Sequence, residues 1–85
     1  MTAIGVKCGV TPEELDYRVV VSRRTVVSWR QLLSALQPEA ALQMVADEVE
    51  MLDTLAISYP ARANELEALI DQWEDLAERL KARAN

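Results

Sequence analysis

The sequence has no histidine and only one cysteine, Cys8, and these two shortages exclude much of the usual chemistry of protein sites. Without histidine, the chain lacks the residues for Ser-His-Asp or Cys-His catalysis and for histidine-based zinc or di-iron sites. One cysteine can form neither an intrachain disulfide nor a zinc knuckle, so we interpret Cys8 as a small buried hydrophobic residue. We therefore expect a protein that is not an enzyme and that has no metal and no cofactor.

Glycine and long apolar runs are also scarce. The two glycines, Gly5 and Gly9, cannot supply a phosphate-binding glycine loop. No run approaches the roughly 18 apolar residues of a membrane span, and no signal peptide opens the chain, which predicts a soluble cytoplasmic protein without a membrane partner. The 85 residues are 51% hydrophobic, which is typical of one globular domain over residues 1–85 with a thin core.

The charges divide the chain into two unequal parts. Residues 1–37 hold five basic and three acidic residues, whereas residues 38–85 hold four basic and eleven acidic residues, which accounts for the net charge of −5. A mildly basic first part and a strongly acidic second part predict two surfaces with different partners. An acidic protein can still bind nucleic acid where its basic groups cluster on one face.

Residues 38–85 have the pattern of an acidic helical hairpin. Apolar residues recur at alternating spacings of three and four, which predicts helices over about 39–57 and 61–82 with a break at Pro60. The apolar stripe is wider than one partner helix covers, so docking on the N-terminal helices or on a second subunit would bury the rest. We expect the hairpin to form a homodimer or to bind a protein partner. The acidic residues over 47–53 are interpreted as a solvated face, with binding of a basic partner surface as the alternative. The residues predicted for the interaction face are Leu42, Val45, Val49, Leu52, Leu66, Ile70, Trp73 and Leu80.

Residues 1–10 allow two interpretations, and a clear helix start follows them. Apolar and small residues alternate up to Val10, which is the pattern of a short strand, while the two glycines favour a loose N-terminal arm. A helix then begins, because Thr11 can cap it, Pro12 suits its first position and Glu14 completes a capping box.

Residues 11–37 predict two short helices with a tight turn between them. The first helix is expected to end near Val19, where three valines in a row interrupt it, and Ser22 has the position of a second helix cap. A second helix is expected from about Arg23 to Leu36. Arginine side chains on its exposed side could reach bases or phosphates in the major groove of DNA.

The stretch TPEELDYRVVVSRRTVVSW resembles the helix-turn-helix DNA-binding family, especially its excisionase-like and repressor-like members. The resemblance covers about residues 11–30, and it implies that residues 21–29 form the turn and the recognition helix. Val20 stands at the turn position where the family usually has glycine. Taken with the exposed arginines, the predicted DNA-contacting residues are Ser22, Arg23, Arg24, Val27 and Ser28.

A rival interpretation makes residues 17–27 strands, because valine, tyrosine and threonine favour β-structure. The fold is then a small N-terminal β element plus the helical hairpin, in place of a mainly α fold in which a short helix-turn-helix precedes the hairpin.

Two functional hypotheses remain. The first is a small DNA-binding transcriptional or mobile-element regulator of phage type, with duplex DNA as its partner. The second is a protein–protein interaction module, such as a phage-type inhibitor, adaptor or assembly chaperone, which acts through the hairpin.

Overall fold

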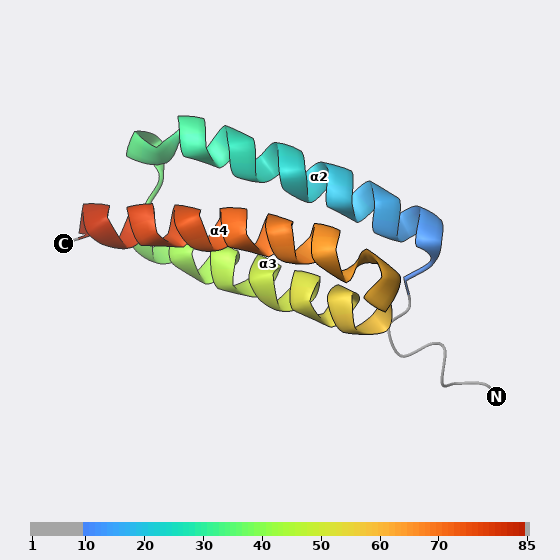
Figure 1. Cartoon of the computed structure of the whole chain (residues 1–85). Coiled ribbons are helices and arrows are strands. Elements are labelled where there is room, and N and C mark those ends of the chain that lie inside the picture. The colour runs from blue at the N-terminus through green and yellow to red at the C-terminus, as the bar shows by residue number, and fades with distance from the viewer. Residues whose placement is uncertain (1–9, 85) are drawn as a thin grey trace.

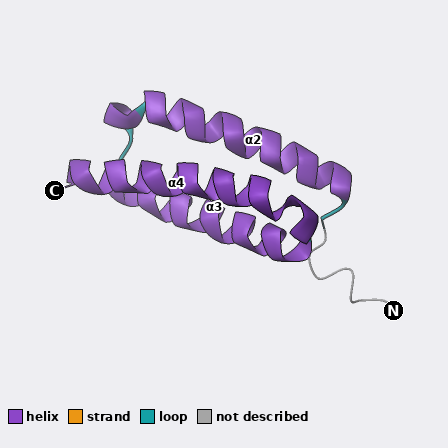
Figure 2. Ribbon diagram, in the orientation of Figure 1, coloured by secondary structure: helices purple, strands orange, loops and turns teal. Residues whose placement is uncertain are grey.

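The computed structural model describes residues 10–84, which form three α-helices joined by two short 3-10 helices (Figure 1). The predicted mainly α fold is confirmed, and residues 10–84 contain no strand (Figure 2). The predicted arm or strand of residues 1–10, and Cys8 with it, lies outside the described residues except for Val10. In chain order the elements are α2 (Pro12–Gln31), η1 (Leu33–Ala35), α3 (Pro38–Ser58), η2 (Pro60–Arg62) and α4 (Ala63–Ala84).

The helices α3 and α4 pack antiparallel as a hairpin (Figure 1). They begin and end within two residues of the limits expected from the sequence. The turn between them falls at Tyr59 and η2, because Pro60 follows directly and the residue before a proline avoids helical geometry. The hydroxyl of Tyr59 donates a hydrogen bond to the carbonyl of Val10, which joins this turn to the chain just before α2.

The first helix differs from the prediction, because α2 runs without a break from Pro12 to Gln31. The expected turn near Val20 and the expected second helix over 23–36 are therefore wrong, and so is the rival prediction of strands over 17–27. No glycine or proline lies between Pro12 and Pro38, so nothing forces the backbone out of the helix. Valine weakens a helix by only about half a kcal/mol per residue, and tertiary packing outweighs that cost.

Ser22 shows why the helix continues. It is 2% exposed and lies in the middle of α2, where the sequence predicts a helix cap. The indole Nε1 of Trp73 in α4 donates a 2.8 Å hydrogen bond to its Oγ, so both buried polar groups are satisfied. Ser22 thereby completes a buried seam with spacings of four, three and four, which consists of Leu15, Val19, Ser22 and Val26.

Both ends of α2 are fixed by hydrogen bonds. At its start, the Oγ1 of Thr11 accepts a hydrogen bond from the amide of Glu14 at 3.1 Å, as the capping prediction required. Beyond its end, the guanidinium of Arg83 donates to the carbonyls of Leu33 and Leu36 at 2.9 and 2.6 Å. Those carbonyls belong to the glycine-free link through η1, so Arg83 of α4 joins this link to the end of the bundle.

One apolar core lies between the three helices. Helix α4 packs against both α2 and α3, and Trp73 in its middle meets Trp29 of α2 edge-on, with ring centroids 5.5 Å apart. The bundle measures 49 × 18 × 17 Å, so its long sides supply most of the surface. The buried hydrophobic residues are Leu15, Val19, Val26, Ala41, Val45, Leu52, Leu55, Leu66, Leu69, Trp73, Leu76 and Leu80.

Substitutions at Val20 test the continuity of α2. Val20→Ala should raise the free energy of unfolding by about half a kcal/mol, because alanine is the better helix former at an exposed position. The free energy of unfolding of Val20→Gly should be about 1 kcal/mol lower than that of Val20→Ala, because glycine is the poorer helix former. Urea denaturation followed by far-ultraviolet circular dichroism measures both. A glycine variant more stable than the alanine variant would indicate a turn with positive φ, and would contradict the continuous helix.

Removal of the Ser22 hydroxyl tests the buried hydrogen bond. Ser22→Ala leaves the indole N–H of Trp73 buried without an acceptor, which should lower the free energy of unfolding by about 1–3 kcal/mol. The double variant Ser22→Ala/Trp73→Phe should lose less free energy of unfolding than the sum of the losses in the two single variants. The matched control Ser28→Ala, on the exposed side of α2, should change stability by less than about 0.5 kcal/mol. Strictly additive losses in the same urea titrations would show that the two residues are not coupled.

Candidate functional site

The five residues predicted to contact DNA are divided by the fold. Ser22 is buried in the bundle, and Arg23 forms an ion pair with α4. Arg24, Val27 and Ser28 are exposed on α2. The structure therefore brings three of the five to the solvent side of one continuous helix, with no separate recognition helix among residues 10–84.

Arg23 belongs to a cluster of charges that joins the first half of α2 to the start of α4. Arg62 donates to Asp16 at 2.7 Å and to Glu65 at 2.8 Å. Arg23 reaches the same Glu65 carboxylate at 3.3 Å. The hydrogen bond from Arg62 holds the pKa of Glu65 below its ordinary value, with a smaller contribution from Arg23. This cluster gives Arg23 a role in holding two helices together.

The eight residues predicted for the hairpin's interaction face are also divided. Leu42, Val49 and Ile70 are half-buried and line one groove. The other five lie in the core at 2% exposure or less, so they have almost no surface to offer a partner, and of these only Val45 also lines the groove. These five are Val45, Leu52, Leu66, Trp73 and Leu80.

An open apolar groove lies between α3 and α4, and α2 contributes nothing to its lining. Its volume is about 680 Å³. Two of its lining residues, Ala46 and Ala77, have small side chains, which let a further helix approach closely. We call this site the α3–α4 groove, and its lining residues are Leu42, Val45, Ala46, Val49, Glu50, Asp53, Ile70, Glu74, Ala77 and Lys81.

Three carboxylates, Glu50, Asp53 and Glu74, border the groove, and we call them the acidic rim. Among residues 10–84, no basic side chain lies within ion-pair distance of any of them. Lys81 is the groove's one basic residue, and its Nζ lies 3.7 Å from a carboxylate oxygen of Glu78. The groove is therefore bordered by negative charge that the described chain leaves uncompensated.

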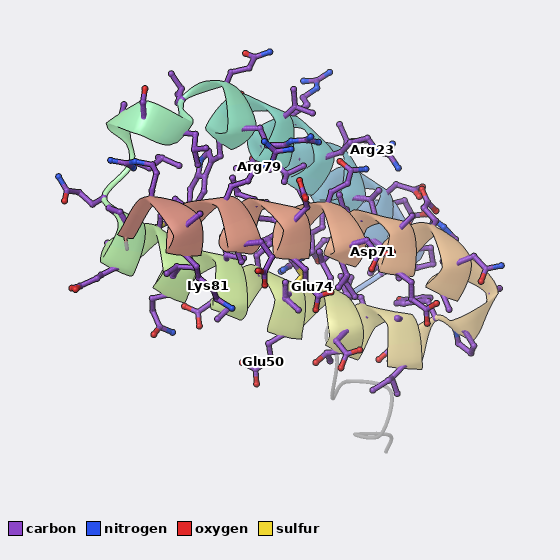
Figure 3. All side chains as sticks on the ribbon, turned by 60° about the vertical axis from the view of Figure 1, so that its left-hand side comes forward. Arg23, Glu50, Asp71, Glu74, Arg79 and Lys81 are labelled. Atoms are coloured by element: carbon purple, nitrogen blue, oxygen red, sulfur yellow. The ribbon has the colours of Figure 1, made fainter. Side chains whose placement is uncertain are left out.

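Charged side chains project from both sides of α4. In Figure 3, Glu74 and Lys81 lie along the side of α4 toward α3, and Glu50 projects from α3. Arg23 and Arg79 lie on the other side of α4, toward α2. Helix α3 adds negative charge on the groove side of the bundle, because it carries five acidic residues and no basic residue.

The sequence prediction did not place Glu74 or Ala46 in a site, and it included Glu50 and Asp53 only within the acidic residues over 47–53. A signal exists, since acidic residues flank the apolar stripe over 47–53 and, as the alternative to a solvated face, predict a surface for a basic partner. Alanine and carboxylate residues at the edge of a stripe are equally typical of a solvated helix face. Only the packing of α2 shows which edge of the stripe remains open.

Comparisons of the chain with protein-family models, with curated proteins and with solved structures found no match. Within residues 10–84, no three histidine, cysteine, aspartate or glutamate side chains are arranged to hold a metal ion. None of the helices in that part of the chain is both long enough and apolar enough to cross a membrane. We therefore base the function on the α3–α4 groove and its acidic rim.

The lowered pKa of Glu65 predicts how the bundle's stability depends on pH. The stabilisation from this ionised carboxylate is present above its unfolded value of 4.5 and is lost as the pH falls through the lower folded-state pKa. Wild type should therefore be more stable than Glu65→Gln at neutral pH, and the difference should shrink toward zero as the medium becomes strongly acidic. Urea denaturation across that pH range measures it. The control Glu67→Gln, exposed on α4, should show a smaller change, and a pH-independent difference for Glu65→Gln would contradict the prediction.

Proposed function

We propose that the chain is a protein–protein interaction module that binds an amphipathic helix of a partner in the α3–α4 groove. Lysine or arginine residues of that helix would lie beside the acidic rim. The observation that carries the proposal is the combination of an open apolar groove with three carboxylates that have no cation beside them in residues 10–84. The proposal develops the second functional hypothesis from the sequence and assigns it a binding site.

The shape of the groove supports a helix as its occupant. Its lining residues on α3 extend from Leu42 to Asp53, which is about 16 Å or three helical turns. Apolar residues at positions i, i+3 or i+4, and i+7 of a partner helix would contact half-buried residues such as Val49 and Ile70. Such a helix would add a fourth member to the bundle and remove this apolar surface from water.

The acidic rim supports a cationic helix in particular. The carboxylates of Glu50, Asp53 and Glu74 are exposed and share one edge region, so their fields add. Opposite charges at the edge of an interface raise the association rate and exclude wrong partners more than they raise affinity. A helix with acidic flanks would be repelled by the same rim.

A designed peptide tests the proposal. The probe is a fluorescein-labelled helical peptide of about 18 residues, or five turns, with leucines along one face and lysines on both flanks. Wild type should bind it saturably in a fluorescence anisotropy titration. Ala46→Glu should weaken binding at least about tenfold, or about 1.4 kcal/mol, because it places a carboxylate in the apolar lining.

The matched control is Ala68→Glu, which makes the same change on the exposed side of α4 and outside the groove lining. It should bind the peptide as wild type does. A second peptide with glutamate in place of every lysine should not bind. If Ala46→Glu and Ala68→Glu bind the lysine peptide equally well, the attraction depends on net charge alone and the proposal is wrong.

DNA binding through α2 is the second candidate function. The feature in its favour is the exposed group of Arg24, Val27 and Ser28 on one helix. The net negative charge of α3 and α4 favours a cationic partner over a nucleic acid. A labelled DNA duplex in the same anisotropy assay separates the two candidates. Duplex binding that Arg24→Ala abolishes and Ala46→Glu leaves unchanged would support DNA binding in place of the groove.

A further inference from the structure

The solvent side of α2 carries exposed apolar side chains among its polar residues. Tyr17, Val20 and Val27 are 69%, 42% and 45% exposed. Together with the exposed Arg24 they are spaced three, four and three along the chain, so they form one stripe on the helix. We call these four residues the α2 outer face. It lies opposite the buried seam of α2 that packs against the hairpin.

The valines of the α2 outer face contribute little to the bundle itself. Valine is among the weaker helix formers, because its branched side chain loses rotamer freedom in a helix. An exposed valine gains little from burial, so polar residues would serve a solvated face better. A stripe of two valines and a tyrosine on the solvent side is therefore typical of a contact surface.

We propose that the α2 outer face of one copy of the chain binds in the α3–α4 groove of a second copy, an inference that rests on the proposed function of the groove. The lengths agree, since Tyr17 to Val27 spans about 15 Å of helix and the groove about 16 Å. The charge that agrees is that of Arg24, whereas Glu13 lies one turn before Tyr17, outside the part of the stripe that enters the groove. Arg24 lies within the apolar stripe and would supply a cation to the acidic rim.

Because the two surfaces differ, this contact is head-to-tail. Two copies in contact leave one groove and one α2 outer face free, so a third copy can add in the same way. A two-fold dimer formed groove to groove would instead bring two acidic rims together, which like-charge repulsion disfavours. The contact covers about three helical turns and is smaller than a stable interface, so we expect it to be weak and concentration-dependent.

Sedimentation equilibrium of the full chain, with two surface variants, tests the inference. Wild type should be monomeric near 10 µM and should exceed the mass of a dimer as its concentration approaches about 1 mM, as expected of a small interface. Ala46→Glu blocks the groove and Arg24→Glu reverses the charge of the α2 outer face, so each variant alone should remain monomeric. An equimolar mixture should form a dimer and stop there, because each variant keeps the surface that the other has lost.

The control Ala68→Glu should associate as wild type does, and circular dichroism verifies that each variant is folded. A wild-type chain that stays monomeric at the highest concentration overturns the inference, as does an Arg24→Glu variant that dimerises on its own. Peptide binding is measured at low micromolar protein, where the chain is expected to be monomeric. If wild type binds the lysine peptide but does not self-associate, the self-association inference is wrong and the proposed function stands. If wild type does not bind the peptide, the proposed function is wrong.

Discussion

The hydrogen bond between Ser22 and Trp73 is the constraint on which the arrangement of the bundle depends. An apolar seam alone permits a helix to shift by one turn, because one hydrophobic contact resembles the next. A buried serine and a buried indole permit only the register in which they meet, since any other leaves both without a partner. In that register Arg23 lies beside Glu65, and the stripe from Tyr17 to Val27 is left in solvent. The surfaces available for binding thus follow from one polar pair inside the core.

The hairpin could be predicted from the sequence because its signals are local and agree with one another. Apolar spacings of three and four cover both helices, and Pro60 stands where the chain must turn. The first helix could not be predicted in the same way, because Ser22 has two physical meanings. Because it follows three valines, Ser22 is predicted to cap a second helix. In the structure it is a buried residue of α2 that accepts a hydrogen bond from the indole of Trp73. That partner is 51 residues away, and no pattern within a helix-length window reveals it.

The candidate site shows a similar limit. The sequence placed Leu42, Val49 and Ile70 on an interaction face, and these residues line the groove. The same prediction included residues such as Leu52, which is buried in the core. An amphipathic stripe has two edges, and the sequence of the hairpin does not show which edge α2 covers. Once α2 is in place, the open edge and its carboxylates are determined.

The glycine-free links have a consequence for the way this chain folds. Neither the link through η1 nor the one through η2 contains a glycine, and each is only a few residues long. Neighbouring helices are therefore held close by short, stiff connections, so bringing them together costs little conformational entropy. A helical bundle with such local contacts is expected to fold within microseconds to milliseconds. The long-range step is the docking of α2 on α4, so the hairpin is the element that can form first and serve as the template for the first helix.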